Sequence, residues 1–527
     1  MPKVLISDKL APDAVEIFKD RGVDVDFRPG LSAEELLDII ADYDGLAIRS
    51  ATKVTEEVLA KATKLRAVGR AGIGVDNVDV VAATNAGVIV MNTPYGNSVT
   101  TAEHAISMML SLTRQIPQAH ASTIAGKWEK SKFLGTELSG KRLGIIGCGN
   151  IGAIVADRAQ GLKMRVMGFD PFLSPERAKT LGIEKVELDE LLEKADFISL
   201  HTPLTDATRN VISADALQKT KKGVRIINCA RGGLIDEVAL CAALHSGHVA
   251  GAALDVFAEE PARENILFEA PNLIATPHLG ASTVEAQEKV ALQVAEQLSD
   301  YLMNGAVTNA LNMANVSAEE APILQPYMKL GSLLGSFLGQ VATPDIQSVR
   351  LEFDGKASQL NEAPVLASTL SGLLGPKMDS VNMVNAAAMA SSRGIDVSTV
   401  RHDRRCDYES LLRMTITFEG GERTVAGTLV GGNKPRLVEV QNIGVEAEFA
   451  KNMLYIRNYD KPGFIGALGS VFGDLSLNIA SFHLGRKNEG EEAIALVEVD
   501  GAISDEALET VKKIPQIVRA DRMHFSA

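Results

Sequence analysis

The sequence predicts an α/β protein in which two doubly wound domains precede an α+β domain and a small terminal domain. Short apolar runs alternate with helical patterns from residue 4 to about residue 282. Such alternation is typical of parallel sheets covered by helices on both faces. After Asn304 the pattern changes to a helical stretch followed by strand-like alternation. Residues 453–525 follow the order β-α-β-β-α-β, which predicts a ferredoxin-like domain.

The first domain is predicted from five short apolar runs. They cover residues 4–7, 23–27, 45–49, 65–69 and 88–91, with helices beginning near Pro12, Ser32, Thr55 and Asn77. This region contains no glycine fingerprint for a dinucleotide. Helical patterns follow at residues 97–113 and 118–127, and the second ends at the only tryptophan, Trp128. We expect these two helices to cross between domains or to form a subunit interface.

The second domain is centred on a glycine turn between an apolar strand and a helical pattern. The turn is Gly147-Cys148-Gly149-Asn150-Ile151-Gly152, and the next apolar run ends at Asp170. In a dinucleotide-binding unit the first glycine permits the turn, the second admits the pyrophosphate, and the third lets helix and strand pack closely. Asp170 stands where such units place the carboxylate that binds a ribose 2'-hydroxyl, which favours NAD over NADP. A lone motif of this kind also fits an ordinary strand, turn and helix.

The remaining strands and domain boundaries follow from the same patterns. Strands of the second domain are predicted at residues 197–201, 224–228, 249–254 and 273–276, and a helix at 282–303 is expected to return to the first domain. The predicted domains are therefore 1–97 with 283–310, 98–282, 311–450 and 451–527. In the third, residues 306–345 are expected to be helical, and alternation at 348–353, 412–418 and 436–440 predicts an antiparallel sheet.

Composition restricts the partners of this protein. The 527 residues include 53 Lys and Arg against 67 Asp and Glu, a net charge of −14. Without a basic run, neither nucleic acid nor an anionic membrane is an expected partner. The sequence shows no signal peptide pattern and no apolar run long enough to span a bilayer. Cys148, Cys229, Cys241 and Cys406 have no metal-ligand or disulfide spacing, so we expect a cytoplasmic protein without a resident metal.

Three polar residues follow strands of the second domain and are candidates for catalysis. They are Arg231, Glu260 and His278. Ligands of open parallel sheets lie beyond the carboxyl ends of the strands, so these side chains are expected to face one crevice. Arg231 can hold a carboxylate through two parallel hydrogen bonds. His278, oriented by a carboxylate, can take a proton from an alcohol as hydride leaves. Each residue alone also fits a structural role, but together with NAD they indicate oxidation of a 2-hydroxy acid.

These residues lie in motifs that resemble those of the D-isomer-specific 2-hydroxyacid dehydrogenases, and most closely of the long-form branch that oxidises D-3-phosphoglycerate. The resemblance extends from the N-terminus to the last domain. Its motifs are residues 69–79, Asn92-Thr93-Pro94, residues 147–152, Ala230-Arg231-Gly232-Gly233, residues 254–261 and residues 277–283. The final domain resembles an ACT domain through residues 458–463 and 477–479. This implies two Rossmann-like domains, substrate-binding and NAD-binding, then an intervening domain and an ACT domain.

The resemblance also implies roles for individual residues. Arg231 would bind the substrate carboxylate and carbonyl, His278 would exchange the proton, and Glu260 would orient it. The substrate carboxylate would contact the backbone of Gly74 and Val75. Its phosphate would lie on Arg49 and Arg70, with Lys130 or Lys132 from another subunit; these lysines also fit a solvated pair. The expected NAD contacts are Ile73, Gly147, Gly149, Asn150, Ile151, Gly152, Asp170, Thr202, Cys229, Ala230, Arg231, Asp255, His278, Leu279, Gly280 and Ala281.

Family members pair their ACT domains side by side and bind L-serine between them, at positions matching Asn458, Asp460 and Asn478. An aspartate can hold the ammonium of serine and an asparagine amide its carboxylate. Asp460 also fits the N-cap of a helix predicted to begin at Pro462. The resemblance thus implies NAD-dependent oxidation of D-3-phosphoglycerate to 3-phosphooxypyruvate, the first step of phosphorylated serine biosynthesis. A homo-oligomer, dimer or tetramer, with serine as effector is expected.

Two main alternatives remain open at this point, and a third, a pure amino-acid sensor, would leave most of the chain unexplained. The first keeps the chemistry and changes the substrate, as in a reductase of glyoxylate, hydroxypyruvate or D-lactate. Such an enzyme needs neither a serine-binding domain nor cations for a phosphate. The second is a non-catalytic NAD sensor or co-repressor on the same scaffold, which leaves Arg231, Glu260 and His278 without a purpose.

Overall fold

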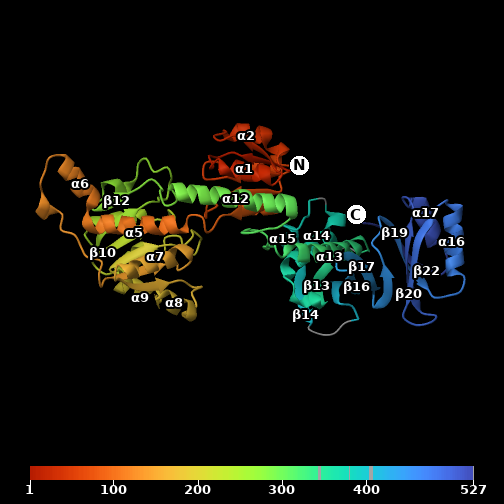
Figure 1. The fold of residues 1–527 in the computed structure, drawn as a ribbon. Helices are drawn as coiled ribbons and strands as arrows, with labels where there is room; N and C mark the ends of the chain where they lie inside the picture. Colours follow the sequence, from red (N-terminus) through yellow and green to blue (C-terminus); the bar gives the residue numbers. More distant parts are fainter. Residues whose placement is uncertain (342–345, 379, 403–406, 526–527) are drawn as a thin grey trace.

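The computed structural model describes residues 1–341, 346–378, 380–402 and 407–525. Cys406 lies outside this range. Figure 1 shows an elongated molecule in which the two α/β units occupy one end and the C-terminal unit the other. Within the described residues, no helix combines the length and the apolar character needed to cross a membrane.

The first unit is a five-stranded parallel sheet in the order β2-β1-β3-β4-β5. One helix differs from the sequence-based prediction, because α4 begins at Val80 rather than near Asn77. Asp79 caps it by accepting a hydrogen bond from the Ala82 amide (2.8 Å), while Asn77 donates to the carbonyls of Arg49 and Thr52. The elements are β1 (Lys3–Ile6), α1 (Asp13–Asp20), β2 (Asp24–Phe27), α2 (Ala33–Ile39), β3 (Gly45–Ile48), α3 (Glu56–Lys61), β4 (Ala67–Arg70), α4 (Val80–Asn85) and β5 (Ile89–Asn92).

The second unit is a seven-stranded parallel sheet in the order β12-β11-β10-β9-β6-β7-β8. Chain order reverses between β6 and β9, and in open α/β sheets ligands bind beyond the carboxyl ends of the strands at such a point. Its elements are α5 (Ser98–Arg114), α6 (Ile116–Ile124), β6 (Arg142–Ile146), α7 (Asn150–Gly161), β7 (Arg165–Phe169), α8 (Pro175–Leu181), β8 (Glu184–Lys185), α9 (Leu188–Lys194), β9 (Phe197–Leu200), α10 (Ala214–Lys219), β10 (Val224–Asn228), α11 (Glu237–His245), β11 (Val249–Leu254) and β12 (Leu273–Ala275).

A long helix, α12 (Val284–Asn304), follows the second sheet and packs on the first. Its buried residues Val290, Val294 and Leu298 share a core with the strands of the first unit. Gly69 of β4 permits this approach, because a Cβ there would lie 2.5 Å from the Val294 side chain. The packing agrees with a discontinuous first domain, whose predicted boundaries remain predictions.

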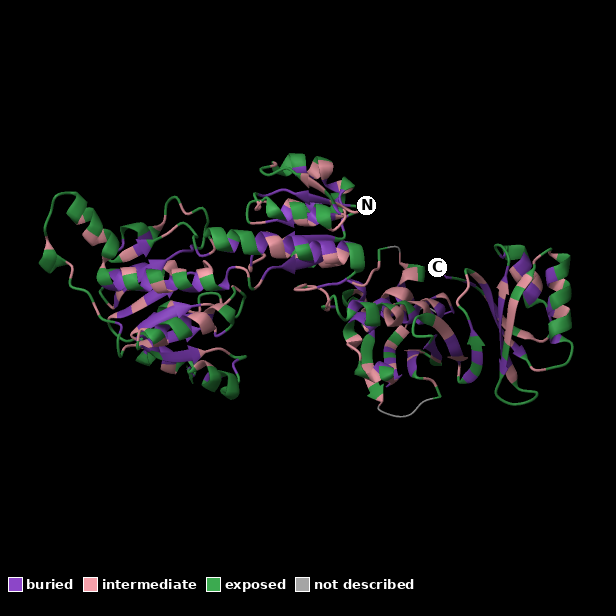
Figure 2. Ribbon diagram, in the orientation of Figure 1, coloured by how far each residue is buried: buried purple, intermediate pink, exposed green. Residues whose placement is uncertain are grey.

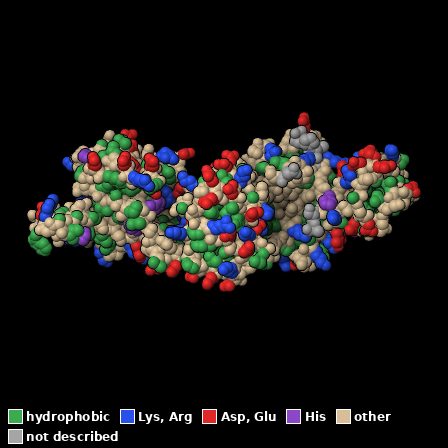
Figure 3. Space-filling model, turned by 90° about the horizontal axis from the view of Figure 1, so that it is seen from above, with side chains coloured by type: hydrophobic (Ala, Val, Ile, Leu, Met, Phe, Trp, Pro, Cys, Tyr) green, Lys and Arg blue, Asp and Glu red, His purple; other side chains and the backbone are tan. Residues whose placement is uncertain are grey.

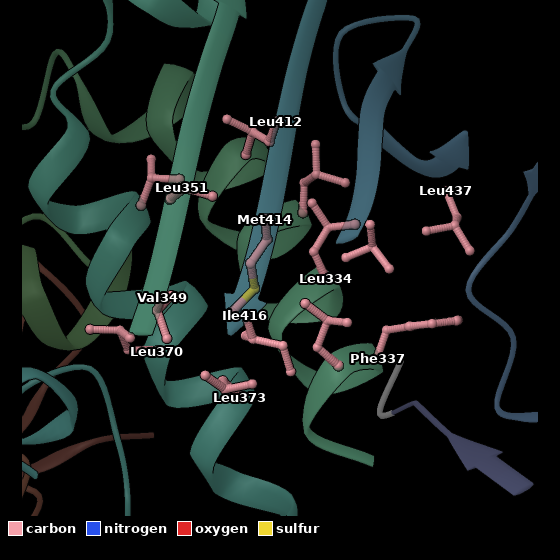
Figure 4. Close-up of a cluster of buried hydrophobic side chains, with 14 of the residues drawn as sticks. Leu334, Phe337, Val349, Leu351, Leu370, Leu373, Leu412, Met414, Ile416 and Leu437 are labelled. Carbon is pink, nitrogen blue, oxygen red and sulfur yellow. The ribbon is translucent and has the colours of Figure 1, made fainter. Parts of the chain in front are cut away.

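The third unit is a six-stranded sheet in the order β14-β13-β15-β16-β17-β18, and helices α13 and α14 share its hydrophobic core. Figure 4 shows Leu334 of α13 beside Met414 and Ile416 of β15. The sheet is mixed rather than antiparallel, since β13 and β14 pair in parallel. The elements are α13 (Ala321–Val341), β13 (Ile346–Gly355), α14 (Glu362–Leu374), α15 (Ala386–Ser392), β14 (Asp396–His402), β15 (Ser410–Phe418), β16 (Gly421–Val430), β17 (Lys434–Val440) and β18 (Ile443–Ala447).

The prediction of a helix from residue 306 was wrong, because α13 begins only at Ala321. The preceding segment is extended and attached to its surroundings. Val307 and Val316 form an antiparallel bridge, and Asn309 has a left-handed backbone (φ 55°). Asn312 binds the first unit, accepting from the Val90 amide and donating to the Val88 carbonyl (both 2.9 Å). These tertiary contacts outweigh the helical propensity of the segment.

The C-terminal unit is a four-stranded antiparallel sheet in the order β20-β21-β19-β22, which confirms the β-α-β-β-α-β prediction. Figure 2 shows α16 largely exposed at the end of the molecule. Asp460 is not its N-cap, because the helix begins at Phe464 after Gly463 (φ 93°). The elements are β19 (Asn452–Tyr459), α16 (Phe464–Asp474), β20 (Ile479–Arg486), β21 (Glu492–Val499), α17 (Asp505–Lys512) and β22 (Ile517–His524).

Candidate active site

The glycine turn after β6 has the geometry that a dinucleotide needs. Gly147 has φ +93°, and a Cβ there would lie 2.5 Å from the His201 carbonyl oxygen. A Cβ on Gly152 would lie 2.1 Å from the Gly147 carbonyl oxygen, so this glycine lets α7 pack on the turn. A Cβ on Gly149, by contrast, would meet no atom within 4 Å. Open backbone at the N-terminus of a helix is where a pyrophosphate binds, and the turn therefore fits NAD.

Asp170, at the end of β7, is fixed beside this turn. Its carboxylate accepts hydrogen bonds from the amides of Cys148 and Phe172 (both 2.8 Å). Thr202 follows β9, which pairs with β6 on the side opposite to β7. An acidic group in this position binds a free ribose 2'-hydroxyl and repels a 2'-phosphate. The local geometry therefore agrees with NAD rather than NADP.

A cleft of about 1160 Å³ opens between the first and second units. It brings together the predicted site residues Arg49, Arg70, Asp255, Glu260, His278 and Ala281. The cleft also contains Lys53 and Asp76, which sequence reasoning did not select. Asp76 lies inside the motif that carries the resemblance, but only the fold shows which side chain it contacts. Lys53 has no distinguishing sequence signal beyond its nearness to Arg49.

His278 and Glu260 form a hydrogen-bonded pair in this cleft. The His278 Nδ1 and a Glu260 carboxylate oxygen are 2.6 Å apart, and the other Glu260 oxygen accepts from the Phe257 amide (3.1 Å). Desolvation alone would raise the pKa of Glu260. The hydrogen bonds from His278 and Phe257, with the positive charge of Arg231, lower that pKa below its usual value instead. An ionised Glu260 keeps a proton on Nδ1 of the ring, which leaves Nε2 to exchange a proton with a ligand.

Arg231 lies beside the cleft rather than in its lining, and groups from both units hold it. Its Nε donates to Asp76 of the first unit (2.9 Å), and its Nη1 donates to the Ala230 carbonyl (2.6 Å). The other terminal nitrogen, Nη2, lies against Gly74, where a Cβ would be 1.5 Å away. The predicted pair of carboxylate-binding elements, the Arg231 guanidinium and the Gly74 backbone, is therefore adjacent in the fold.

Arg70 adds a buried positive charge to the same cleft. Burial lowers the pKa of Arg70 to about 10, and the nearby charge of Arg231 acts in the same direction. Its Nε is buried without a hydrogen-bond partner. A buried cation with an unpaired donor is costly unless an anion pairs with it. Together with Arg49 in the lining and Arg231 beside it, this makes the cleft suited to an anionic ligand.

Apart from Ile73, the remaining predicted NAD contacts lie at the carboxyl edge of the second sheet. Asn150 and Ile151 begin α7, Cys229 and Ala230 follow β10, and Leu279, Gly280 and Ala281 lie in the loop after β12. Ile73 is in the loop after β4, where its carbonyl accepts from Asn92 (2.7 Å). Asp255 differs from the others, because its side chain is fully buried and its hydrogen bonds are made within the protein. Their contacts with NAD stay predictions.

Lys130 and Lys132 do not belong to the cleft within this chain. They form the short turn η2 (Lys130–Lys132) in the arm that follows α6, at one end of the molecule in Figure 1. Lys132 pairs with Glu129 (3.6 Å), and both lysines are exposed.

A second cavity, of about 480 Å³, lies in the C-terminal unit. Asn458 and Asp460 line it, together with Arg486 and the start of α16. The Asn458 Oδ1 is buried without a partner, and Asp460 accepts from Arg486 (2.7 Å) and from the Gly490 amide (3.3 Å). Asn478 does not line this cavity; it donates to Asp500 (2.7 Å).

Three segments of the chain match known protein families. Residues 106–280 match the D-isomer specific 2-hydroxyacid dehydrogenase NAD binding domain. Residues 323–441 match the D-3-phosphoglycerate dehydrogenase intervening domain, and residues 452–516 match the ACT domain. The first match identifies the glycine turn as part of an NAD-binding domain, and the third assigns the C-terminal unit to a family of regulatory domains.

Whole-chain relatives give the same picture. The chain is 41% identical to a D-3-phosphoglycerate dehydrogenase of Bacillus subtilis and to one of Methanocaldococcus jannaschii, covering 98% of each chain. Among solved structures, a glyoxylate reductase from Paecilomyes thermophila is similar with TM-score 0.55 and 32% identity, over 59% of this chain and 98% of that one. The D-lactate dehydrogenase of Escherichia coli is similar with TM-score 0.53 and 28% identity, over 59% of this chain and 100% of that one. The chain therefore belongs to the D-isomer-specific 2-hydroxyacid dehydrogenases, in the D-3-phosphoglycerate dehydrogenase branch that carries an intervening domain and an ACT domain.

Proposed function

We propose that this protein oxidises D-3-phosphoglycerate to 3-phosphooxypyruvate with NAD, the first step of the phosphorylated route to L-serine. One observation carries the proposal: a single cleft contains the His278 and Glu260 pair and two arginines, Arg49 and Arg70, and the Arg70 Nε is buried without a partner. A proton carrier beside anion-binding groups suits a substrate that is both a hydroxy acid and an anion.

The proton moves through His278. Glu260 holds Nδ1, so Nε2 takes the proton of the substrate C2 hydroxyl as the C–H bond breaks. NAD, when bound, accepts the hydride from C2. The carboxylate of Glu260 also stabilises the imidazolium that His278 becomes after it takes the proton. In the reverse direction His278 is the acid that returns the proton to the carbonyl oxygen.

The cations fix the substrate at both ends. The Arg231 Nη2, together with the backbone at Gly74 and Val75, holds the C1 carboxylate. Arg49 and Arg70 receive the phosphate, and Lys53 lines the same cleft and adds a third positive charge there. A dianionic phosphate compensates buried positive charge better than a neutral hydroxyl does.

The phosphorylated substrate is preferred over the alternatives for two reasons. The solved glyoxylate reductase and D-lactate dehydrogenase are similar only over 59% of this chain, and whole-chain relatives are D-3-phosphoglycerate dehydrogenases. In addition, the Arg70 Nε has no hydrogen-bond partner, and an acid without a phosphate would not supply one. A non-catalytic NAD sensor would have no use for the 2.6 Å contact between His278 and Glu260.

Parallel assays test this proposal directly. NADH formation is measured at alkaline pH with D-3-phosphoglycerate, D-glycerate and D-lactate, using wild type, His278→Ala and His120→Ala. His120 is exposed on α6 and serves as the matched control. Selective turnover of the phosphorylated acid, lost only in His278→Ala, is expected. Turnover restricted to unphosphorylated acids would contradict the substrate, and no turnover with any acid would favour a sensor.

L-serine is the proposed effector, bound in the cavity of the ACT domain. Asp460 would hold its ammonium, and the unpaired Asn458 Oδ1 would accept a further hydrogen bond from that ammonium, because the Asn458 Nδ2 already donates to the Tyr459 carbonyl. Asn478 lies outside this cavity, as expected if it completes the site from the ACT domain of a second copy. Serine would also have to displace Arg486 from Asp460.

Calorimetry with L-serine tests the effector site. Asp460→Ala is expected to abolish heat of serine binding and any serine effect on turnover, while kcat without serine stays at the wild-type value. Asp474→Ala, which removes an exposed carboxylate at the other end of α16, is the control. Equal serine binding by wild type and Asp460→Ala would exclude this cavity.

A homo-oligomer is also proposed, because the end of α6 and the arm after it expose large apolar side chains. Trp128, Leu134 and Ile124 are exposed by 87%, 82% and 72%, and such clusters mark contacts between proteins. Acidic and basic side chains are interspersed over the face shown in Figure 3, which does not suit nucleic acid as a partner. A cytoplasmic location remains part of the proposal. Light scattering of the purified chain measures the number of subunits.

A further inference from the structure

The loop that carries His278 has an unusual backbone for its sequence. His278 has φ 54°, in the left-handed region that non-glycine residues rarely adopt. Such a conformation persists only where neighbouring groups hold it. Its amide donates to the Asp255 carbonyl oxygen (2.9 Å), and this bond attaches His278 to the residue that follows β11.

The Asp255 side chain holds the rest of the loop. It accepts hydrogen bonds from the Leu279 amide (2.7 Å), the Gly280 amide (2.8 Å) and the Thr276 hydroxyl (2.6 Å). Residues on both sides of His278 are thereby bound to one carboxylate. Loss of this acceptor would release two amides and the conformation of His278 with them.

Asp255 is fully buried, so its negative charge requires compensation. Burial alone would raise the pKa of Asp255, but hydrogen bonds from His104, Thr276 and Leu279 lower it below its usual value. Within the described residues, His104 supplies the one basic nitrogen at ion-pair distance from this carboxylate, with Nε2 3.2 Å from Oδ1. His104 is therefore the side chain that stabilises the buried carboxylate of Asp255.

Helix α5 contacts the same loop at a second point, one turn before His104. The Thr101 hydroxyl donates to the Gly280 carbonyl (2.9 Å), and this residue precedes His104 by three positions on the same helical face. The helix itself is anchored, because it packs against α7 and β11. The two contacts thus connect the His278 loop to a rigid element of the NAD-binding domain.

A metal site at this place is a weaker explanation. His104, Asp255 and Cys229 bring potential ligand atoms within 4.8 Å of one another. The Asp255 oxygens, however, already accept from three N–H and O–H donors besides His104. Burial also raises the pKa of the Cys229 thiol well above its usual value, so a thiolate is disfavoured there.

We propose that His104 and Thr101 are positioning residues, which hold the His278 loop through Asp255 and Gly280 so that Nε2 faces the substrate. This inference rests on the proposed function, because it assigns His278 the proton transfer. Neither residue touches the substrate in this proposal. Their replacement should therefore impair the chemical step more than the binding of the hydroxy acid.

Steady-state kinetics of four variants tests the proposal in the full-length protein. His104→Leu removes the donor, His104→Gln keeps one, and Thr101→Val breaks only the contact with Gly280. Glu103→Gln is the matched control, since it changes the exposed neighbour of His104 on the same helix. A displacement of the catalytic group by about 1 Å costs on the order of 100-fold in rate. We expect a loss of that order in kcat for His104→Leu, a smaller loss for His104→Gln and Thr101→Val, and little change in KM.

Hydrogen exchange gives a readout that does not depend on turnover. Amide exchange in residues 277–284 should accelerate in His104→Leu and Thr101→Val and stay at the wild-type rate in Glu103→Gln. An active wild type with unchanged kcat in folded His104→Leu would overturn the proposal. If the wild type turns over no hydroxy acid, the proposed function fails and exchange decides the positioning role: faster exchange supports it, and unchanged exchange overturns it. If His104→Leu does not fold, the same criteria apply to His104→Gln and Thr101→Val.

Discussion

Asp76 of the first domain accepts a 2.9 Å hydrogen bond from the Nε of Arg231 in the second, across 155 positions of sequence. Arg231 uses two of its nitrogens within the protein, and the third, Nη2, lies against Gly74. The Asp76 carboxylate lines the cleft and therefore orients the guanidinium of the second domain beside it. Asp76 itself is largely exposed, so the pair contributes orientation more than stability.

Replacement of Asp76 by Ala is expected to raise the KM for the hydroxy acid while NADH affinity stays at the wild-type value. An exposed ion pair contributes up to about 1 kcal/mol, which corresponds to about a 5-fold change in an equilibrium constant. Steady-state kinetics and NADH fluorescence titration measure the two quantities. Asp42→Ala, in the exposed turn η1 (Ile40–Asp42), removes an equivalent charge from the same domain as a control. A KM below the wild-type value would mean that Asp76 competes with the substrate for Arg231.

Glu260→Gln is expected to reduce kcat by on the order of 100-fold or more, because an amide N–H facing Nδ1 selects the wrong tautomer of a catalytic histidine. Glu259→Gln removes the neighbouring charge and should behave as the wild type. Kinetics with D-3-phosphoglycerate and NAD compares the two variants. Equal kcat values in wild type and Glu260→Gln would show that Glu260 does not orient His278.

The lowered pKa of Glu260 predicts that the free energy of unfolding depends on pH. The pKa of Glu260 is lower in the folded protein than its usual value of 4.5. Its ionised form therefore stabilises the fold above pH 4.5, and this contribution is lost as the pH falls through the lower folded-state value. The difference in melting temperature between wild type and Glu260→Gln should shrink over that acidic range. A difference that grows toward acid would reverse the sign of the shift.

The sheets and the glycine turn could be predicted from the sequence because their signals are local. Apolar runs bounded by turns located the strands along the chain, and the spacing from Gly152 to Asp170 indicated NAD. Arg231, Glu260 and His278 could be selected since each follows a strand. Asp76 and His104 could not be assigned their contacts, because their partners Arg231 and Asp255 are distant in sequence.

Errors arose where tertiary contacts decided the local structure. Residues 306–320 contain neither glycine nor proline, so nothing in their composition argues against a helix. Asn312 nevertheless attaches the segment to the first domain in an extended form. Asp460 fits an N-cap by residue type, but Arg486, from a strand far along the chain, takes its carboxylate. Neither partner is visible within a window of neighbouring residues.

Gly149 and Gly152 should respond differently to alanine. A Cβ at Gly149 meets no protein atom within 4 Å, so Gly149→Ala is expected to keep its melting temperature and to lose NAD affinity by about 10-fold or more through contact with the pyrophosphate. A Cβ at Gly152 would lie 2.1 Å from the Gly147 carbonyl oxygen, so Gly152→Ala is expected to lower both quantities. Thermal unfolding measures the melting temperature and NADH titration measures the cofactor affinity, so the two experiments separate the two effects. Normal NADH affinity in Gly149→Ala would place the pyrophosphate elsewhere.

A final prediction concerns the exposed lysines of the arm, Lys130 and Lys132. They do not line the cleft of their own chain, so any contact with substrate phosphate must come from a second copy. A Lys130→Ala, Lys132→Ala double variant should then raise the KM for D-3-phosphoglycerate more than the KM for D-glycerate. Lys127→Ala, an exposed lysine earlier in the same arm, is the control.

Complementation then distinguishes a shared site from an indirect effect of the lysines. In a mixed dimer of the double lysine variant with His278→Ala, one site combines an intact His278 with intact lysines from its partner. Co-expression at equal levels yields such mixed dimers as about half of the population, so about a quarter of the wild-type sites should be active. Activity at low substrate that exceeds the sum of the two separate variants supports the shared site. Activity equal to that sum would assign the lysines to the solvated pair.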